Sequence, residues 1–110
     1  MREQDRAWAA CAIDSEGVIT SSRCGNRRYH TCPHPRLELA NTNRQYMEKF
    51  CNIFNLGHDR IKRYRNGSNG WIYKVQVCSM KNIARILQEI HPYLIIKRQR
   101  AERTVGRCIM

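Results

Sequence analysis

Two carboxylates, Asp14 and Glu16, lie at the end of a segment whose composition predicts a helix, and Gly17 follows them directly. The C-terminal end of a helix disfavours negative charge by a few tenths to about 1 kcal/mol. A divalent cation would reverse that cost, and Mg²⁺ takes one or two protein carboxylates together with phosphate oxygens and water. The pair therefore indicates a metal site, with a solvated surface turn as the plainer alternative.

The side chains that could meet a substrate are mostly basic. The formal net charge is +11, and 15 of the 20 basic residues are arginine. Arginine offers phosphates and guanine edges a planar fork, whereas lysine offers a point charge. A compact domain with this charge repels itself unless a polyanion compensates it. Composition therefore favours a nucleic-acid partner, although ribosomal-type proteins and antimicrobial peptides share the same charge.

The cysteines could bind metal or form the core. No two of the six have C-x-x-C spacing, so a zinc ribbon finds no support. Ordinary residues in a reducing compartment are the preferred interpretation. Four potential zinc ligands nevertheless share one predicted hairpin, in no established spacing: Cys24, His30, Cys32 and His34. Three others have apolar neighbours and are predicted to be small core residues: Cys11, Cys51 and Cys78.

A helix over Glu3–Ile13 would carry the acidic pair at its end. The segment lacks Gly and Pro, and its small residues 9–12 would let a second backbone approach closely. Gly17 is expected to end this helix.

Two hairpins and three further helices follow in the predicted order. The first hairpin has strands at Val18–Tyr29 and Arg36–Ala40 and a polar turn with Pro33 and Pro35. The second has strands at Arg60–Arg65 and Trp71–Val77 around a Gly-rich loop. Asn41–Asn43 and Ser79 are expected to cap helices. Those helices are predicted over Arg44–Asn55, from Ser79 to Pro92, and over Ile96–Arg107.

This order predicts an α+β fold of αββαββα type, with residues 1–110 as a single domain. Helices would cover one face of a four-stranded antiparallel sheet and leave a basic face open. Such a face suits the major groove of a duplex. No apolar run approaches the roughly 20 residues of a membrane span. The first residues do not resemble a secretory signal, so we expect a soluble intracellular protein without a membrane partner.

The segment from Ala9 to Gly17 resembles the LAGLIDADG motif of homing endonucleases, most clearly in Ile13-Asp14-Ser15-Glu16-Gly17. The predicted element order is also that of the family. Residues 37–42, LELANT, look like its second strand leading into a helix, and residues 91–101 look like the segment with its active-site lysine. The resemblance extends from about Ala7 to Val105. Ala9 replaces the usual leucine, and Cys11 replaces the usual glycine.

The resemblance implies a site-specific DNA endonuclease that uses Mg²⁺, or another divalent cation such as Mn²⁺. Glu16 would bind the metal with help from the Ser15 carbonyl, while Asp14 would be a metal-site residue of mainly structural importance. Lys97 would stabilise developing charge or position the attacking water. Asn41 and Gln45 would belong to the solvent network around the reaction. A surface lysine and an N-capping asparagine are the plainer interpretations of Lys97 and Asn41.

One motif per chain further implies a homodimer that cuts both strands of a near-palindromic duplex. The expected interface residues are Ala9, Ala10, Cys11 and Ile13. The open sheet face supplies the candidates for DNA contact: Thr20, Ser22, Asn26, Arg28, Arg36, Glu38, Lys62 and Lys74. The resemblance also implies mobility with an intron or intein.

Two other functions remain open at this point. The chain could be a LAGLIDADG-derived binding protein that does not cleave, such as an intron RNA maturase or a transcription regulator. It could also be a structural RNA-binding protein of ribosomal type, for which the charge is sufficient and the acidic motif incidental. The acid at Glu16 and the lysine at Lys97 favour the endonuclease.

Overall fold

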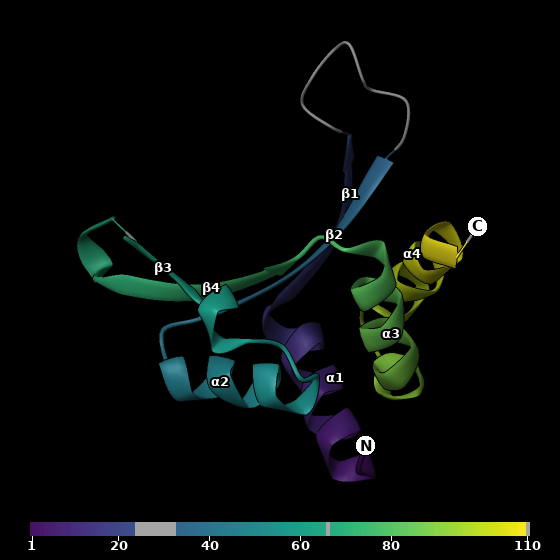
Figure 1. The fold of residues 1–110 in the computed structure, drawn as a ribbon, viewed down its shortest axis with the longest axis horizontal. Coiled ribbons are helices and arrows are strands. Elements are labelled where there is room, and N and C mark those ends of the chain that lie inside the picture. The colour runs from purple at the N-terminus through teal and green to yellow at the C-terminus, as the bar shows by residue number, and fades with distance from the viewer. Residues whose placement is uncertain (24–32, 66, 110) are drawn as a thin grey trace.

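The computed structural model describes residues 1–23, 33–65 and 67–109. The order of elements in this part of the chain confirms the predicted α+β fold (Figure 1). The elements are α1 (Glu3–Glu16), β1 (Gly17–Arg23), β2 (Pro33–Asn41), α2 (Arg44–Ile53), β3 (Lys62–Arg65), β4 (Trp71–Val77), α3 (Met80–Ile90) and α4 (Arg98–Ile109). Short 3-10 turns lie at His58–Arg60, Gly67–Asn69 and His91–Tyr93.

The four strands form an antiparallel sheet in the order β1-β2-β4-β3. Its buried residues alternate along the strands, as a sheet covered on one face requires. They are Ile19, Leu37, Leu39, Val75 and Val77. These residues belong to the same core cluster as the buried sides of the helices. The residues between them therefore lie on the opposite, open face, and the predicted division of the sheet into two faces is confirmed.

The helices cover the sheet with apolar stripes at helical spacing. Met47, Phe50 and Cys51 of α2 are buried, and so are Ile83, Ile86, Leu87 and Ile90 of α3. Two caps follow the prediction, since the side chain of Asn43 caps α2 and that of Ser79 caps α3. None of the helices in the described ranges is long and apolar enough to span a membrane.

The prolines of the first hairpin lie in a strand and not in a turn, which corrects the prediction. Pro33 and Pro35 belong to β2, where they pair with Arg23 and Ser21 of β1. The pairing of β2 with β4 begins only at Leu37. This end of β2 is therefore an edge on its other side, where the missing proline N–H breaks no ladder hydrogen bond.

Two of the three cysteines predicted to be core residues are exposed. Only Cys51 is buried, whereas Cys11 and Cys78 face solvent. Cys78 follows the last residue of β4, beyond the alternation that places Val77 in the core. Cys11 lies in a helix with small residues around most of its circumference. The sequence of that helix therefore did not show which side would be buried.

Candidate functional site

The end of α1 presents Glu16 at the junction between the helix and the sheet. Glu16 is the last residue of α1, and Gly17 is both its C-cap and the first residue of β1. A Cβ atom at Gly17 would lie 2.8 Å from the Cα of Ile13 and 2.9 Å from its carbonyl oxygen. The chain can therefore turn so sharply from helix to strand only with glycine at this position. As a result, Asp14 and Glu16 lie at the border of the sheet.

Asn41, the last residue of β2, donates a hydrogen bond from Nδ2 to Glu16 Oε2 at 2.6 Å. The orientation of its amide is fixed from the other side, because Oδ1 accepts the backbone N–H of Asn43 at 2.7 Å. Asn43 in turn caps α2 by accepting the N–H of Gln45. The expected cap and the expected active-site residue are thus two different asparagines. The start of α2 holds Asn41 against Glu16.

Asp14 uses both carboxylate oxygens to hold the segment before α4. Oδ2 accepts the backbone N–H of Ile95 at 2.7 Å, and Oδ1 accepts that of Lys97 at 3.0 Å. Lys97 returns a contact, because its Nζ donates to the backbone carbonyl of Asp14 at 2.6 Å. A cation at the C-terminal end of a helix also meets its dipole favourably. Asp14 therefore holds the backbone of residues 95–97, and Lys97 lies at the end of α1.

These contacts also explain why α4 begins at Arg98 and not at Ile96 as expected. The backbone N–H groups of Ile95 and Lys97 point to Asp14, and the first helical hydrogen bond runs from Ala101 to the Lys97 carbonyl.

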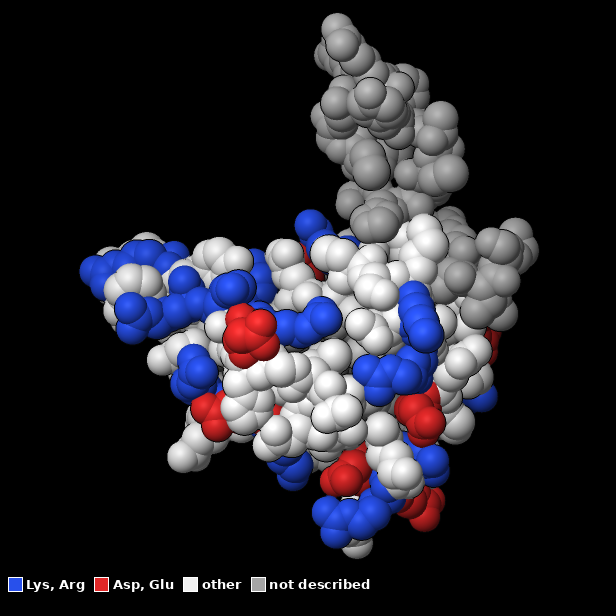
Figure 2. Space-filling view, viewed as in Figure 1, with Lys and Arg blue, Asp and Glu red and all other residues white. Residues whose placement is uncertain are grey.

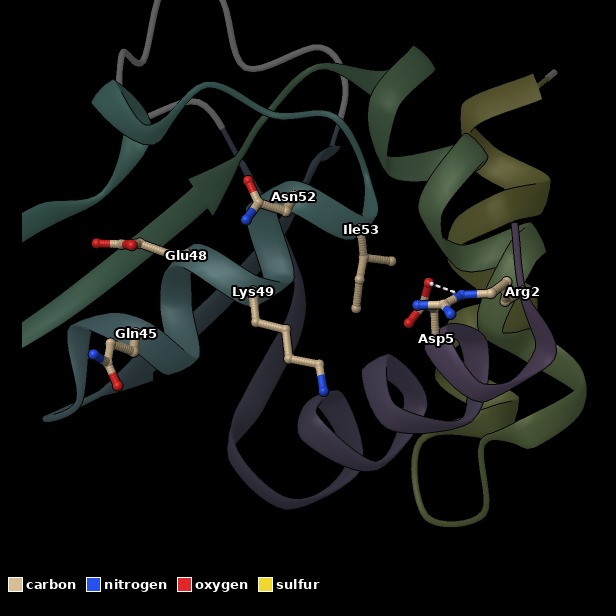
Figure 3. Close-up of a pocket in the computed structure, with 7 residues that line it drawn as sticks. All are labelled: Arg2, Asp5, Gln45, Glu48, Lys49, Asn52 and Ile53. Atoms are coloured by element: carbon tan, nitrogen blue, oxygen red, sulfur yellow. Dashed lines mark ion pairs between the residues drawn. The ribbon is translucent and has the colours of Figure 1, made fainter.

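Gln45 lies apart from the Glu16–Asn41 pair. It lines a hollow of about 380 Å³ between α2 and the start of α1, together with Arg2, Asp5 and Lys49 (Figure 3). No side-chain hydrogen bond or ion pair within the described ranges joins Gln45 to Glu16. The structure therefore does not bring this expected catalytic residue to the site. The next residue along the chain, Tyr46, is close enough to Glu16 for the carboxylate charge to affect its hydroxyl.

Tyr46 is a neighbour of the site that sequence reasoning missed. Burial raises the pKa of its hydroxyl, and the negative charge of Glu16 raises the pKa further. Its ring packs against Trp8, with the ring centroids 5.0 Å apart. The Tyr46 ring thus helps to set the angle between α1 and α2 beside Glu16.

Ser15, whose carbonyl was expected to help hold a metal, donates a hydrogen bond from its hydroxyl to the Cys11 carbonyl at 2.8 Å.

The side of α1 expected to contact a second copy is mostly buried within the chain. Ala9 and Ile13 are 0% exposed and Ala10 is 1% exposed, so of the four expected interface residues only Cys11 faces solvent. The small alanines pack against this chain's own core. The exposed side of α1 carries Ala7, Cys11 and Ser15 at intervals of four residues.

That exposed side of α1 continues into an apolar surface. Ile95 and Ile96, from the segment held by Asp14, are 85% and 76% exposed. They line a hollow of about 360 Å³ that reaches the exposed side of α1. A partner that covers α1 would therefore also cover these two isoleucines. We call this surface the α1 face, made of Ala7, Cys11, Ser15, Ile95 and Ile96.

The open face of the sheet carries five of the eight residues expected to contact DNA. The strand register places Thr20 opposite Arg36 and Lys62 opposite Lys74, and Glu38 lies two residues from Arg36 on the same face. Basic side chains gather over the β3–β4 hairpin, at the left of Figure 2. Asn26 and Arg28 lie outside the described residues. The backbone of Ser22 belongs to β1, but its side chain is not described.

A hollow of about 350 Å³ indents the open face next to α3. Its lining includes Arg60, Lys62, Lys74 and Gln76. Lys74 also lies over the exposed ring of Tyr64, with its Nζ 5.3 Å from the ring centroid. Positive charge is thus combined with hydrogen-bonding groups that can contact a nucleic acid.

Within the described ranges, no group of three or more His, Cys, Asp or Glu side chains is placed to hold a metal ion. The alternative of a zinc site falls largely outside those ranges, because Cys24, His30 and Cys32 are not described. A metal at Glu16 would therefore find at most one further ligand of these four types within the described ranges.

Similar solved structures come from homing endonucleases. No family model and no curated protein sequence matches the chain. The homing endonuclease I-CvuI, in complex with the I-CreI target and 2 mM Mg, aligns with a TM-score of 0.73 at 17% identity, over 94% of this chain and 65% of that chain. An archaeal intron-encoded homing endonuclease, I-Vdi141I, complexed with DNA, aligns with a TM-score of 0.74 at 16% identity, over 97% of this chain and 68% of that chain.

A third similar structure carries the motif's name. The LAGLIDADG homing endonuclease I-GzeII, in complex with a DNA target, aligns with a TM-score of 0.62 at 20% identity. The alignment covers 92% of this chain and 35% of that chain. This chain therefore spans about two thirds of the first two proteins and about one third of the third. It has the LAGLIDADG homing endonuclease fold.

Proposed function

We propose that the chain is a subunit of a homing endonuclease that hydrolyses the phosphodiester backbone of duplex DNA with the help of a divalent cation. The observation that carries this proposal is the 2.6 Å hydrogen bond between Asn41 Nδ2 and Glu16 Oε2. It joins Glu16 of the acidic motif to Asn41 of residues 37–42, 25 positions later, and each of these two segments resembles the family independently of the other. The junction lies where the helix meets the sheet that would contact the duplex.

The residues at the end of α1 fit a Mg²⁺-type cation that shares its ligands with the substrate. Glu16 is exposed, and no donor among the described residues bonds to its Oε1. Magnesium is usually held by one or two carboxylates plus phosphate oxygens and waters. Glu16 would be the acidic ligand, and the Ser15 carbonyl would be a neighbouring oxygen. When bound, such a cation activates water and stabilises the attacking and leaving oxygens.

The other residues of the site would hold the backbone in place and orient the side chains that act on the substrate. Asn41 keeps the Glu16 carboxylate in one orientation. Asp14 fixes the backbone of residues 95–97 and thereby the start of the Lys97 side chain. The Lys97 ammonium, now bonded to the Asp14 carbonyl, supplies positive charge beside the place where a phosphate would lie. Its attraction for a phosphate that gains negative charge would lower the barrier to cleavage.

A homodimer would complete the site, because Glu16 is the acidic ligand that each chain would supply. Two copies that meet through the α1 face would bring two Glu16 carboxylates to one two-fold axis, where like charges require cations between them. The shared axis matches a nearly palindromic target. Each copy would cut one strand.

The test compares wild type, Glu16→Gln and Glu48→Gln in a plasmid-nicking assay with Mg²⁺ on a target selected from a random duplex library. Glu16→Gln should lower cleavage by about 100-fold or more while duplex binding persists, because the amide no longer attracts a cation. Glu48 pairs with Arg44 on α2 and serves as a control of equal charge, so Glu48→Gln should cleave like wild type.

Two results would contradict the proposal. If wild type binds its selected duplex in Mg²⁺ or Mn²⁺ but cuts neither strand, the chain is a binding protein with an endonuclease fold. If it prefers structured RNA to every duplex and Glu16→Gln binds that RNA equally well, the polyanion partner is RNA.

A further inference from the structure

Two buried polar atoms on the open face have no hydrogen-bond partner, and they belong to residues paired across two strands. They are Thr20 Oγ1 and Arg36 Nε, the only such side-chain atoms within the described ranges. The strand register pairs Thr20 with Arg36 across β1 and β2. Buried polar groups are nearly always hydrogen-bonded in folded proteins. Two such atoms on one cross-strand pair single out this part of the open face, where the exposed part of the Arg36 side chain is accessible to another molecule.

Beside these atoms, a carboxylate joins two strands. Glu38 Oε1 accepts a hydrogen bond from Gln76 Nε2 at 2.6 Å, across the β2–β4 pairing. The same oxygen lies 3.1 Å from Arg36 Nε, which is an ion pair without hydrogen-bond alignment. Only 15% of the Glu38 side chain is exposed, compared with 39% of Arg36. Gln76 therefore fixes Glu38, and Glu38 restrains the guanidinium of Arg36.

Among the described residues, none accepts a hydrogen bond from the outer edge of the guanidinium. Nε faces Glu38, and Arg36 donates no hydrogen bond to any acceptor in the described part of the chain. Its two terminal nitrogens can therefore form a pair of parallel donors. Guanine presents two acceptors, O6 and N7, in the major groove, and a bidentate arginine is the commonest contact to them.

A carboxylate such as Glu38 has an electrostatic cost on a face that meets DNA. A negative charge on a surface that meets a polyanion weakens binding to every sequence. That cost is offset when the carboxylate improves discrimination between sequences, as a residue that holds an arginine in one orientation does. Simple solubilisation would not require an oxygen shared between Arg36 and Gln76.

We propose that Arg36 reads a guanine in each half of the DNA target, and that Glu38, held by Gln76, is the residue that positions it. This inference rests on the proposed function, since it requires a duplex on the open face. Thr20, the cross-strand partner of Arg36, would lie near the same base pair.

The experiment selects binding sites from a random duplex library with wild type, Arg36→Lys and Glu38→Gln, and then measures the affinity for each base at each position. Arg36→Lys keeps the charge but loses the fork, so discrimination for guanine should fall about tenfold at one position per half-site. Glu38→Gln should lose discrimination at that same position, while affinity for a non-cognate duplex rises.

Two controls make the same exchanges away from the cluster. Arg63→Lys changes an arginine that lies opposite Tyr73 on the other face of the sheet, and its base preferences should be those of wild type. Glu48→Gln removes a carboxylate that pairs with Arg44 on α2, and it should change no position. Melting curves by circular dichroism confirm that each variant folds.

The outcomes separate the two proposals. If wild type selects a sequence but Arg36→Lys and Glu38→Gln keep its full profile, the reading role is overturned and the endonuclease proposal stands. If Arg36→Lys loses a guanine and Glu38→Gln does not, Glu38 has no positioning role. If wild type selects no duplex sequence, both proposals fail together.

Discussion

Asn41 has a fixed orientation because its two amide atoms have different partners. Oδ1 accepts a backbone N–H at the start of α2, which leaves Nδ2 to donate to Glu16. Asp14 is constrained in the same way by two backbone N–H groups. At the scale of single residues, the candidate site therefore consists of one exposed carboxylate and neighbours whose own bonds restrain it.

Asn41→Ala is expected to slow cleavage and to leave DNA affinity nearly unchanged. Without the amide, the Glu16 carboxylate can rotate, and loss of such an outer partner typically costs 10- to 100-fold in activity or metal affinity, so we expect a decrease of about 10-fold or more. The measurement is the single-turnover cleavage rate at saturating enzyme, next to the duplex dissociation constant.

Asn52→Ala is the matched control, because Asn52 bonds to His58 on a distant part of the surface. Equal single-turnover rates in Asn41→Ala and wild type would show that Glu16 needs no such restraint.

The junction between α1 and β1 determines where the acidic motif ends up. Gly17 has an ordinary negative φ of −83°, so glycine is needed there for space and not for a left-handed backbone. Gly17 lies directly against the backbone of Ile13, one turn earlier in the same helix, and this close approach lets the strand enter the sheet at once. At the scale of elements, helix and strand are therefore connected with no linker, and the position of Glu16 follows from both.

Gly17→Ala should destabilise the fold by about 1–3 kcal/mol, because the added methyl group meets backbone atoms of Ile13 that cannot move aside freely. Gly106→Ala in α4 is the control, since a Cβ there has no neighbour within 4 Å. That variant should be neutral or slightly stabilising. Urea unfolding curves of the two variants measure the difference, and equal midpoints would refute the steric role of Gly17.

At the scale of the whole molecule, the described residues form two surfaces of different character. The open sheet face is basic and polar, whereas the α1 face is small and apolar, with two highly exposed isoleucines. A net charge of +11 suits the first surface to a polyanion and contributes nothing to the second. The two surfaces meet near Glu16, so a duplex and a second copy could both reach the carboxylate.

Cys11→Arg should convert the proposed dimer into a folded monomer. Arginine would place charge and volume in the middle of the α1 face, where two helices are expected to approach closely. Its exposed position means that the monomer's own core is untouched. Sedimentation velocity should show half the mass, with an unchanged melting temperature.

Cys78→Arg provides the control at the other exposed cysteine, which lines the hollow in the open face. It should remain a dimer. A wild-type protein that sediments as a monomer, or a Cys11→Arg variant that sediments as a dimer, would contradict the proposed interface.

Much of the fold could be predicted from the sequence because the signals are local. The stripe of α3, the caps at Asn43 and Ser79 and the alternation of β4 each depend on residues a few positions apart. The boundaries that were wrong depend on distant contacts. Pro35 is in a strand because β4 leaves that edge unpaired, and α4 starts late because Asp14 binds the segment before it.

The sequence by itself determined the order of the elements, the basic open face and the position of an acidic pair at a helix end. Helical and strand periodicity and the sign of the charges were sufficient for these. Only the tertiary structure decided that Asn41 contacts Glu16, that Asp14 positions Lys97, and which side of α1 is exposed. The contacting residues lie 25 to 83 positions apart. In α1, small residues occupy both sides of the helix, so no apolar periodicity marks the side that is buried. That side is defined only by the packing of α1 against the rest of the fold.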